Sequence, residues 1–143
     1  MNDRYLFRAK RTDNGEWVEG YLLNVAKLNA FICTGKIKID GALKGIVAPE
    51  MYAVDPSTIC QCTGFSDEVK KKIFEGDIVG FIDCTSTENG YSEQYCRGQV
   101  TWDKETASFQ VTELLSAESY EVLDRGCKVL GNIFDNAELM EEW

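Results

Sequence analysis

The stretch Ile73-Phe74-Glu75-Gly76-Asp77-Ile78-Val79-Gly80-Phe81-Ile82 decides the fold class of this 143-residue chain. Apolar and β-branched residues resume directly after Gly76-Asp77, a pair that suits a bend. We therefore expect a sharp bend followed by a strand over residues 78–82, as in a small curled barrel. A second run, Val129-Leu130-Gly131-Asn132-Ile133, belongs to the expected last strand of the chain.

Short candidate strands separated by turn residues precede this stretch. Tyr5-Leu6-Phe7 and residues 17–22 flank Asn14-Gly15, and an Asn-Gly pair supplies the positive φ angles of a tight antiparallel hairpin. Further candidates at 30–33, 37–39 and 52–54 extend the pattern to an antiparallel β-meander. A turn or a single helical turn is expected at Asp55-Pro56-Ser57-Thr58, close to a boundary between two lobes.

The second part of the chain repeats this pattern of short strands. Strands are expected at 95–102 and 108–111, and the polar residues 85–94 are expected to form a loop. Asn136 as an N-cap, with Glu138 at the positive end of the helix dipole, predicts a closing helix. The predicted fold is therefore all-β, with an N-terminal antiparallel meander, an SH3-like small barrel lobe and a short C-terminal helix.

The length of the chain matches one domain. Folding at this size removes about two-thirds of the surface of the unfolded chain from water, which is enough for one core or for two small lobes that share it. We expect a single domain, 1–143, with lobes at 1–58 and 59–143.

The formal net charge of −9 is carried by the second part of the chain. Residues 1–50 hold 8 Lys or Arg and 6 Asp or Glu, whereas residues 51–143 hold 7 and 18. Because nucleic acids attract clustered Lys and Arg, this acidic surplus argues against general nucleic-acid binding. The basic run Lys70-Lys71-Lys72 is interpreted as a solvated loop. Mimicry of DNA by an acidic face is an alternative.

Histidine is absent from the sequence, which excludes Ser-His-Asp triads, Cys-His dyads and His-based zinc sites. The close pair Cys60 and Cys62 lacks the paired C-x-x-C spacing of a zinc site. On a strand these two side chains face the same side, so they either pack in the core or converge on a metal. We favour core packing and expect no cofactor and no metal.

No apolar stretch of signal-peptide length follows Met1-Asn2-Asp3-Arg4. No segment approaches the roughly 20 apolar residues of a membrane span. We therefore expect a protein of the host cell cytoplasm, with no membrane partner, in a compartment where thiols persist.

Glu75 and Asp77, with Arg97 as a third member, form the set that most resembles a reaction centre. Two carboxylates beside a glycine can hold a cation or share acid and base roles. The structural alternative is that Gly76 permits a bend while Asp77 accepts hydrogen bonds from turn amides. We favour this alternative and assign no catalytic residue.

Two further positions have both a binding and a structural interpretation. Arg8 beside Trp17 forms either a binding patch or a cross-strand clamp. Asn132, after Gly131, forms either an anion-binding nest or a turn with a cap. We favour the structural interpretation of each. No Walker loop, dinucleotide fingerprint or nucleophile elbow is present.

Aromatic residues on a small barrel can stack on nucleic-acid bases. Here their surroundings are acidic, so we expect them to fill the barrel or to contact a protein. The residues concerned are Tyr91, Tyr95, Trp102 and Phe109.

Short motifs follow one another along nearly the whole chain: Tyr5-Leu6-Phe7-Arg8-Ala9, Trp17-Val18-Glu19-Gly20, Thr63-Gly64-Phe65, Glu75-Gly76-Asp77-Ile78-Val79, Gly98-Gln99-Val100 and Gly131-Asn132-Ile133-Phe134-Asp135-Asn136. Together they resemble the YopX family of phage and prophage proteins. The resemblance implies an all-β fold with a compact barrel-like C-terminal lobe, a phage origin and no established biochemical activity.

The chain departs from this family at two places. After Thr63-Gly64-Phe65 the family usually has an Asp followed by an Asn-Gly turn, whereas this chain continues Ser66-Asp67-Glu68-Val69-Lys70-Lys71-Lys72. Ala137 stands where the family tends to have Pro, and alanine lacks the rigid helix start that proline gives.

We therefore expect a non-enzymatic phage accessory protein that binds an unknown host or phage protein, or further copies of itself. The alternatives are association with nucleic acid through the more basic residues 1–50 and a metal-dependent enzyme that uses Glu75 and Asp77. The binding candidates are Arg8, Trp17, Gly64, Glu75, Asp77 and Asn132.

Overall fold

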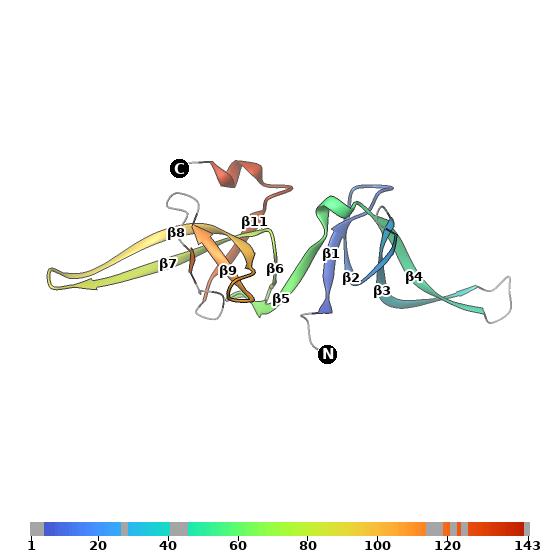
Figure 1. Ribbon diagram of the computed structural model, residues 1–143, viewed down its shortest axis with the longest axis horizontal. Helices are drawn as coiled ribbons and strands as arrows, with labels where there is room; N and C mark the ends of the chain where they lie inside the picture. The colour runs from blue at the N-terminus through green and yellow to red at the C-terminus, as the bar shows by residue number, and fades with distance from the viewer. Residues whose placement is uncertain are drawn as a thin grey trace. The chain divides into compact units, whose positions relative to one another are not determined.

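The computed structural model describes residues 5–26, 29–40, 46–113, 119–120, 123 and 126–141. These residues form mostly antiparallel β-structure (Figure 1), which confirms the expected all-β class. The chain divides into two compact units, Met1–Cys62 and Thr63–Trp143, which we describe separately. The organisation as one domain with lobes 1–58 and 59–143 stays a prediction.

The first unit contains an antiparallel sheet with the strand order β4-β3-β2-β1-β5. The strands are β1 (Phe7–Lys10), β2 (Trp17–Ala26), β3 (Asn29–Asp40), β4 (Ile46–Val54) and the first residues of β5 (Cys60–Ser66). The predicted hairpin is confirmed, because β1 pairs with β2 and Gly15 has a φ of 73° in the turn between them. Pairing of β2 with β3 and of β3 with β4 confirms the meander.

Small and branched side chains fill the core of this unit. The buried cluster is Ala9, Ala30, Ile32 and Val54, with Phe7, Val18, Leu22 and Ile59 packed against it. The chain then forms a single 3₁₀ turn, η3 (Pro56–Thr58), as expected. Asp55 caps this turn, since its Oδ1 accepts a hydrogen bond from the Ser57 amide at 3.0 Å.

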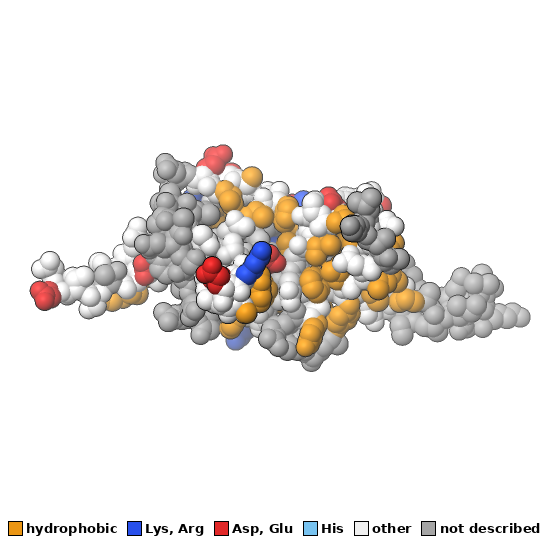
Figure 2. Space-filling model, viewed as in Figure 1, with side chains coloured by type: hydrophobic (Ala, Val, Ile, Leu, Met, Phe, Trp, Pro, Cys, Tyr) orange, Lys and Arg blue, Asp and Glu red, His pale blue; other side chains and the backbone are white. Residues whose placement is uncertain are grey.

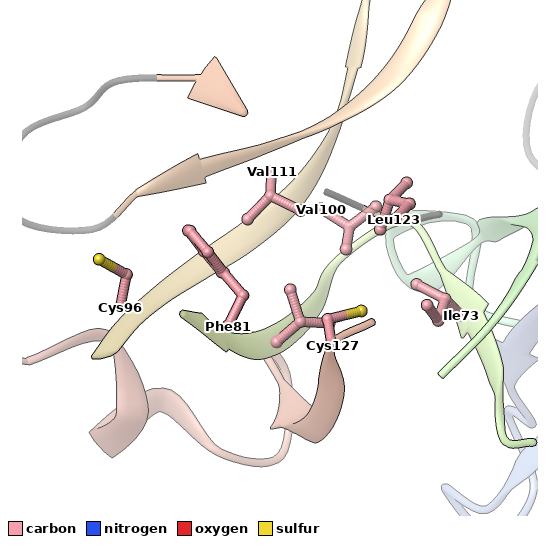
Figure 3. Packing of buried hydrophobic residues seen from close by; sticks show 8 residues of the cluster. Ile73, Phe81, Cys96, Val100, Val111, Leu123 and Cys127 are labelled. Carbon is pink, nitrogen blue, oxygen red and sulfur yellow. The ribbon is translucent and has the colours of Figure 1, made fainter. Parts of the chain in front are cut away.

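The second unit builds a five-stranded antiparallel sheet with the order β10-β9-β8-β7-β11. A hairpin made by the end of β5 and by β6 (Lys72–Phe74) precedes the sheet. The sheet strands are β7 (Asp77–Thr87), β8 (Gly90–Asp103), β9 (Ser108–Glu113), β10 (Ser119–Tyr120) and β11 (Lys128–Asn132). Figure 3 shows the buried hydrophobic cluster, which comprises Ile73, Val79, Phe81, Cys96, Val100, Val111, Leu123 and Cys127.

The expected SH3-like barrel is wrong. Within the described residues the sheet stays open, because its strand order ends at β10 and β11 and no pairing joins these two strands. β7 and β8 continue past their neighbours instead of curling towards closure, since β11 pairs with β7 only from Asp77 to Gly80.

The expected C-terminal helix is also wrong. Its place is taken by a single 3₁₀ turn, η4 (Ala137–Met140), in which no backbone amide donates a capping hydrogen bond to the Asn136 side chain. The Asn136 Oδ1 instead accepts a hydrogen bond from the Asn132 amide at 3.1 Å. Without that cap, so short a segment does not offset the cost of helix nucleation.

The polar residues 85–94, expected to form a loop, are mostly paired strand. β7 and β8 pair without interruption from Ile78 opposite Gln99 to Thr87 opposite Gly90. The turn consists of Glu88 and Asn89, and Gly90 follows with a φ of 120°. The Asn89-Gly90 pair, a sequence typical of hairpin turns, overlaps this turn by one residue.

Candidate functional site

The two most characteristic motifs of the sequence lie side by side in the second unit. In the ladder between β7 and β11, Asn132 is directly opposite Asp77. Gly76 has a φ of 86°, its amide donates to the Val100 carbonyl at 2.9 Å, and its carbonyl accepts from the Ile133 amide at 3.0 Å. The motifs thus connect β7, β8 and β11 at one end of the sheet.

Asp77 is buried in this junction. Its Oδ2 accepts a hydrogen bond from the Phe74 amide at 2.8 Å, which is the kind of turn contact that the structural interpretation expects. Glu75 is half-buried on the same turn. Among the residues that the structure describes, no three Asp, Glu, Cys or His side chains converge as a metal site requires. The geometry supports a turn, and a binding role for Glu75 and Asp77 stays a prediction.

Arg97, the third member of that set, lies opposite Gly80 in the ladder between β7 and β8, three positions along β7 from Asp77. Its Nη2 donates to the Glu141 carbonyl at 3.1 Å. This contact holds the segment after η4 against the sheet and does not join Arg97 to the two carboxylates.

Asn132 organises the turn that follows β11. Its Oδ1 accepts hydrogen bonds from the amides of Phe134 and Asp135, both at 2.9 Å. Gly131 is required beside it, because a Cβ at this position would collide with the Asn136 side chain. These contacts support the capping interpretation of Asn132, and its role in binding stays a prediction.

Arg8 and Trp17 are brought together in the first unit. The Arg8 Cζ lies 4.8 Å from the centroid of the indole ring. Lys10 is directly opposite Trp17 in the ladder, with its Nζ 5.4 Å from the same ring. Because Arg8 is buried, it contacts the indole within the unit, as a cross-strand clamp does. A binding role for this pair stays a prediction.

The hairpin of β5 and β6 contains Gly64, which is exposed and has a φ of 87°. Its neighbour Thr63 is buried and donates from Oγ1 to the Ile73 carbonyl at 2.8 Å. Gly64 thus follows a residue that fixes the two strands of the hairpin. Its role in binding stays a prediction.

Asp67 is a structural centre that the sequence did not reveal. Its buried carboxylate accepts hydrogen bonds from three amides: Oδ1 from Val69 at 3.0 Å and Lys71 at 2.9 Å, and Oδ2 from Val129 at 3.1 Å. Burial opposes ionisation, but these amides and the Lys71 charge hold the pKa of the carboxyl below its usual value. Asp67 therefore ties the hairpin tip to β11.

Cys60 and Cys62 are both buried free thiols. The Cys60 Sγ lies 3.3 Å from the Thr58 carbonyl oxygen. Together with the lack of converging ligands within the described part of the chain, this supports the core-packing interpretation of the pair.

Residues 82–95, which we call the arm, form a two-stranded ribbon. β11 pairs with β7 no further than Gly80, and β9 pairs with β8 only from Gly98 onwards. Figure 1 shows β7 and β8 extending together beyond the rest of the sheet. Because two strands alone bury little surface, a ribbon of this kind is marginally stable in water.

The arm has one apolar, aromatic face. The ladder places Ile82 opposite Tyr95, Cys84 opposite Glu93 and Ser86 opposite Tyr91, and alternation along strands puts these six side chains on one side. We call this side the tyrosine face. Ile82, Tyr91 and Tyr95 are 57%, 63% and 48% exposed, so the expectation that Tyr91 and Tyr95 fill a barrel is wrong.

The other two aromatic candidates lie on the sheet itself. Trp102 and Phe109 are cross-strand neighbours with ring centroids 4.9 Å apart in an edge-to-face arrangement. Phe109 packs against the core cluster, whereas Trp102 stays exposed.

The arm is acidic throughout. Residues 82–95 contain Asp83, Glu88 and Glu93 and no Lys or Arg. In the view of Figure 2, hydrophobic and acidic side chains lie along it. The arm therefore presents apolar area and negative charge together.

The fold defines an all-β protein with an open antiparallel sheet, in which the characteristic motifs build a strand junction. The model of the family described as YopX protein matches residues 6–141. The chain therefore belongs to the YopX family, which confirms the resemblance drawn from its motifs. A search of curated proteins found no match. Within the described residues, no helix has the length and apolar character needed to cross a bilayer.

Proposed function

We propose that this protein is a phage or prophage accessory protein that works in the host cytoplasm by binding another protein and catalyses no reaction itself. The observation that carries the proposal is the arm, whose tyrosine face exposes Ile82, Tyr91 and Tyr95. Clustered apolar side chains on a protein surface mark interaction sites, and tyrosine is enriched there.

The charge of the arm favours a protein partner over nucleic acid. Association with DNA or RNA depends on Lys and Arg that displace counterions from phosphates. The arm has three carboxylates and no such cation. In the more basic first unit, Arg8 is buried against Trp17 and is poorly placed to reach a phosphate.

The surroundings of Asp77 and Glu75 weaken the case for a metal-dependent enzyme. The Asp77 carboxylate is buried and bonded to the Phe74 amide, whereas Glu75 remains partly exposed. A pair of carboxylates that shares a cation needs both groups turned to one accessible position. The contacts of these two residues therefore fit a structural role better than a catalytic one.

Affinity capture of the tagged full chain from infected and uninfected host lysates, with and without nuclease, tests the proposal. We expect a stoichiometric protein partner that persists after nuclease treatment. Recovery that disappears with nuclease would contradict protein binding and favour the nucleic-acid alternative. Loss of the partner at moderate salt in both samples identifies charge as the main attraction.

A further inference from the structure

We infer, on the basis of the proposed protein-binding function, that the arm docks a protein segment that carries Lys or Arg beside apolar side chains. The tyrosine face supplies both parts of this recognition. Ile82, Tyr91 and Tyr95 provide exposed apolar area, and Glu93 lies among them on the same face.

Contacts of Tyr95 and Tyr91 orient the face before any partner binds. The Tyr95 ring lies across Gly80, where a Cβ would collide with it, and Leu130 adjoins the same position. The Tyr91 hydroxyl lies 2.7 Å from the Glu93 Oε1 and 3.1 Å from the Cys84 Sγ. These contacts restrict the rotamers of the two tyrosines, so the two side chains lose less conformational freedom on binding.

The chemistry of the face selects a cation with an apolar stem. A Lys or Arg side chain packs its methylene groups on aliphatic surface and places its charge over a tyrosine ring or against a carboxylate. A tyrosine hydroxyl is neutral at physiological pH because its ordinary pKa is about 10, and the contacts of Tyr91 with Cys84 and Glu93 raise that pKa further. Glu93 then provides the negative charge beside the Tyr91 ring.

Other occupants fit this surface less well. A nucleic acid would bring phosphates against Asp83, Glu88 and Glu93. A second copy that stacks arm on arm would bring two such acidic arms together. The nearest cations of the same sheet, Arg97 and Lys128, both lie in the row of Gly80 at the base of the arm. Charge complementarity along the arm itself therefore points to a basic partner.

A display library of random short peptides, selected on the immobilised full chain, tests this assignment. We expect the enriched peptides to contain more Lys and Arg than the starting library, next to apolar residues. Binding of an enriched peptide is then measured on two arm variants, Ile82→Thr/Tyr91→Thr and Glu88→Gln/Glu93→Gln. Threonine keeps a high strand preference at both positions, and a thermal melt of each variant verifies its fold.

The Ile82→Thr/Tyr91→Thr variant should bind the enriched peptide with an affinity lower by about tenfold or more, as expected for truncation of anchoring side chains. The Glu88→Gln/Glu93→Gln variant should bind the same peptide with a several-fold lower affinity, and this affinity should depend less on salt. Glu105→Gln is the matched control, because Glu105 is an exposed carboxylate in the turn between β8 and β9. This control should bind like the wild type.

Several results would overturn the assignment. Enriched peptides that bind all variants equally place binding elsewhere on the protein, and peptides without excess Lys or Arg contradict the chemistry of the partner. A wild-type dimer that the arm variants dissociate assigns the face to a second copy instead. Failure to enrich any peptide also counts against it. Lysate capture tests the proposed function independently. A nuclease-resistant protein partner found in that experiment would stand whatever the peptide selection shows.

Discussion

The Asp67 carboxylate accepts a hydrogen bond from the Val129 amide at 3.1 Å, although the two residues are 62 positions apart in the chain. The other oxygen of the carboxylate accepts bonds within the hairpin tip, from Val69 and Lys71. One buried side chain therefore connects a local turn with the last strand of the sheet. This connection explains why an acidic residue is buried at the hairpin tip.

Replacement of this acceptor should destabilise the second unit. Asp67→Asn keeps the shape but turns one acceptor oxygen into a donor, which leaves at least one of the three amides without its partner. We expect the free energy of unfolding to fall by about 1–3 kcal/mol. Urea denaturation at neutral pH measures this, with Asp83→Asn on the arm as the control. Equal midpoints for Asp67→Asn and the wild type would contradict the role of Asp67.

The contribution of Asp67 should depend on pH. Because its pKa is lowered in the folded protein, its stabilisation is present above the unfolded pKa of about 4 and is lost as the pH falls through the folded value. The stability difference between wild type and Asp67→Asn should therefore be largest near neutrality and shrink at acidic pH. Urea titrations from pH 7 to pH 3 check this, and a constant difference would argue against an ionised Asp67.

Lys70 should be a site of stabilising substitution. It has a φ of 68° in the hairpin turn, a conformation that costs a side chain about 1 kcal/mol and glycine nothing. Lys70→Gly should raise the free energy of unfolding by up to about 1 kcal/mol, whereas Lys71→Gly, where φ is not positive, should lower it. Thermal melts of the two variants compare these signs directly. A loss of stability in Lys70→Gly would show that the turn is held differently.

The cysteines should differ widely in reactivity. Burial and the nearby charges of Asp67, Glu68 and Asp77 raise the pKa of Cys127 to about 11, while Cys84 is exposed on the arm. Since the thiolate is the reactive form, iodoacetamide at pH 7.5 should modify Cys84 first and Cys127 only after unfolding. Peptide mapping by mass spectrometry over time tests the order. Equally fast alkylation of Cys127 in the native protein would contradict its burial.

Features that depend on neighbouring residues were predictable from the sequence. The hairpin around Asn14-Gly15 and the capped turn at Asp55 each follow from a few adjacent side chains and backbone preferences. The bend at Gly76 with the Asp77 contact to the Phe74 amide was predictable for the same reason. The role of Asp67 was not, because it depends on a strand 62 positions away.

The composition of the arm conceals its two strands. Residues 85–94 are polar, as loops are, and a ribbon without a core behind it needs no alternation of buried and exposed residues. The Asn89-Gly90 pair indicates the position of its turn to within one residue. The expectation of a barrel fails for a related reason. Closure of a sheet depends on the number, tilt and stagger of its strands, which short apolar runs do not reveal.

Capture from nuclease-treated host lysate with three forms of the full chain tests the central claim that the arm binds a protein. The forms are the wild type, Ile82→Thr/Tyr91→Thr on the tyrosine face, and Val69→Thr as a control at an exposed apolar residue outside the arm. We predict that the wild type and Val69→Thr recover the same protein and that the arm variant, equally folded, loses it. Equal recovery by the arm variant would contradict the claim.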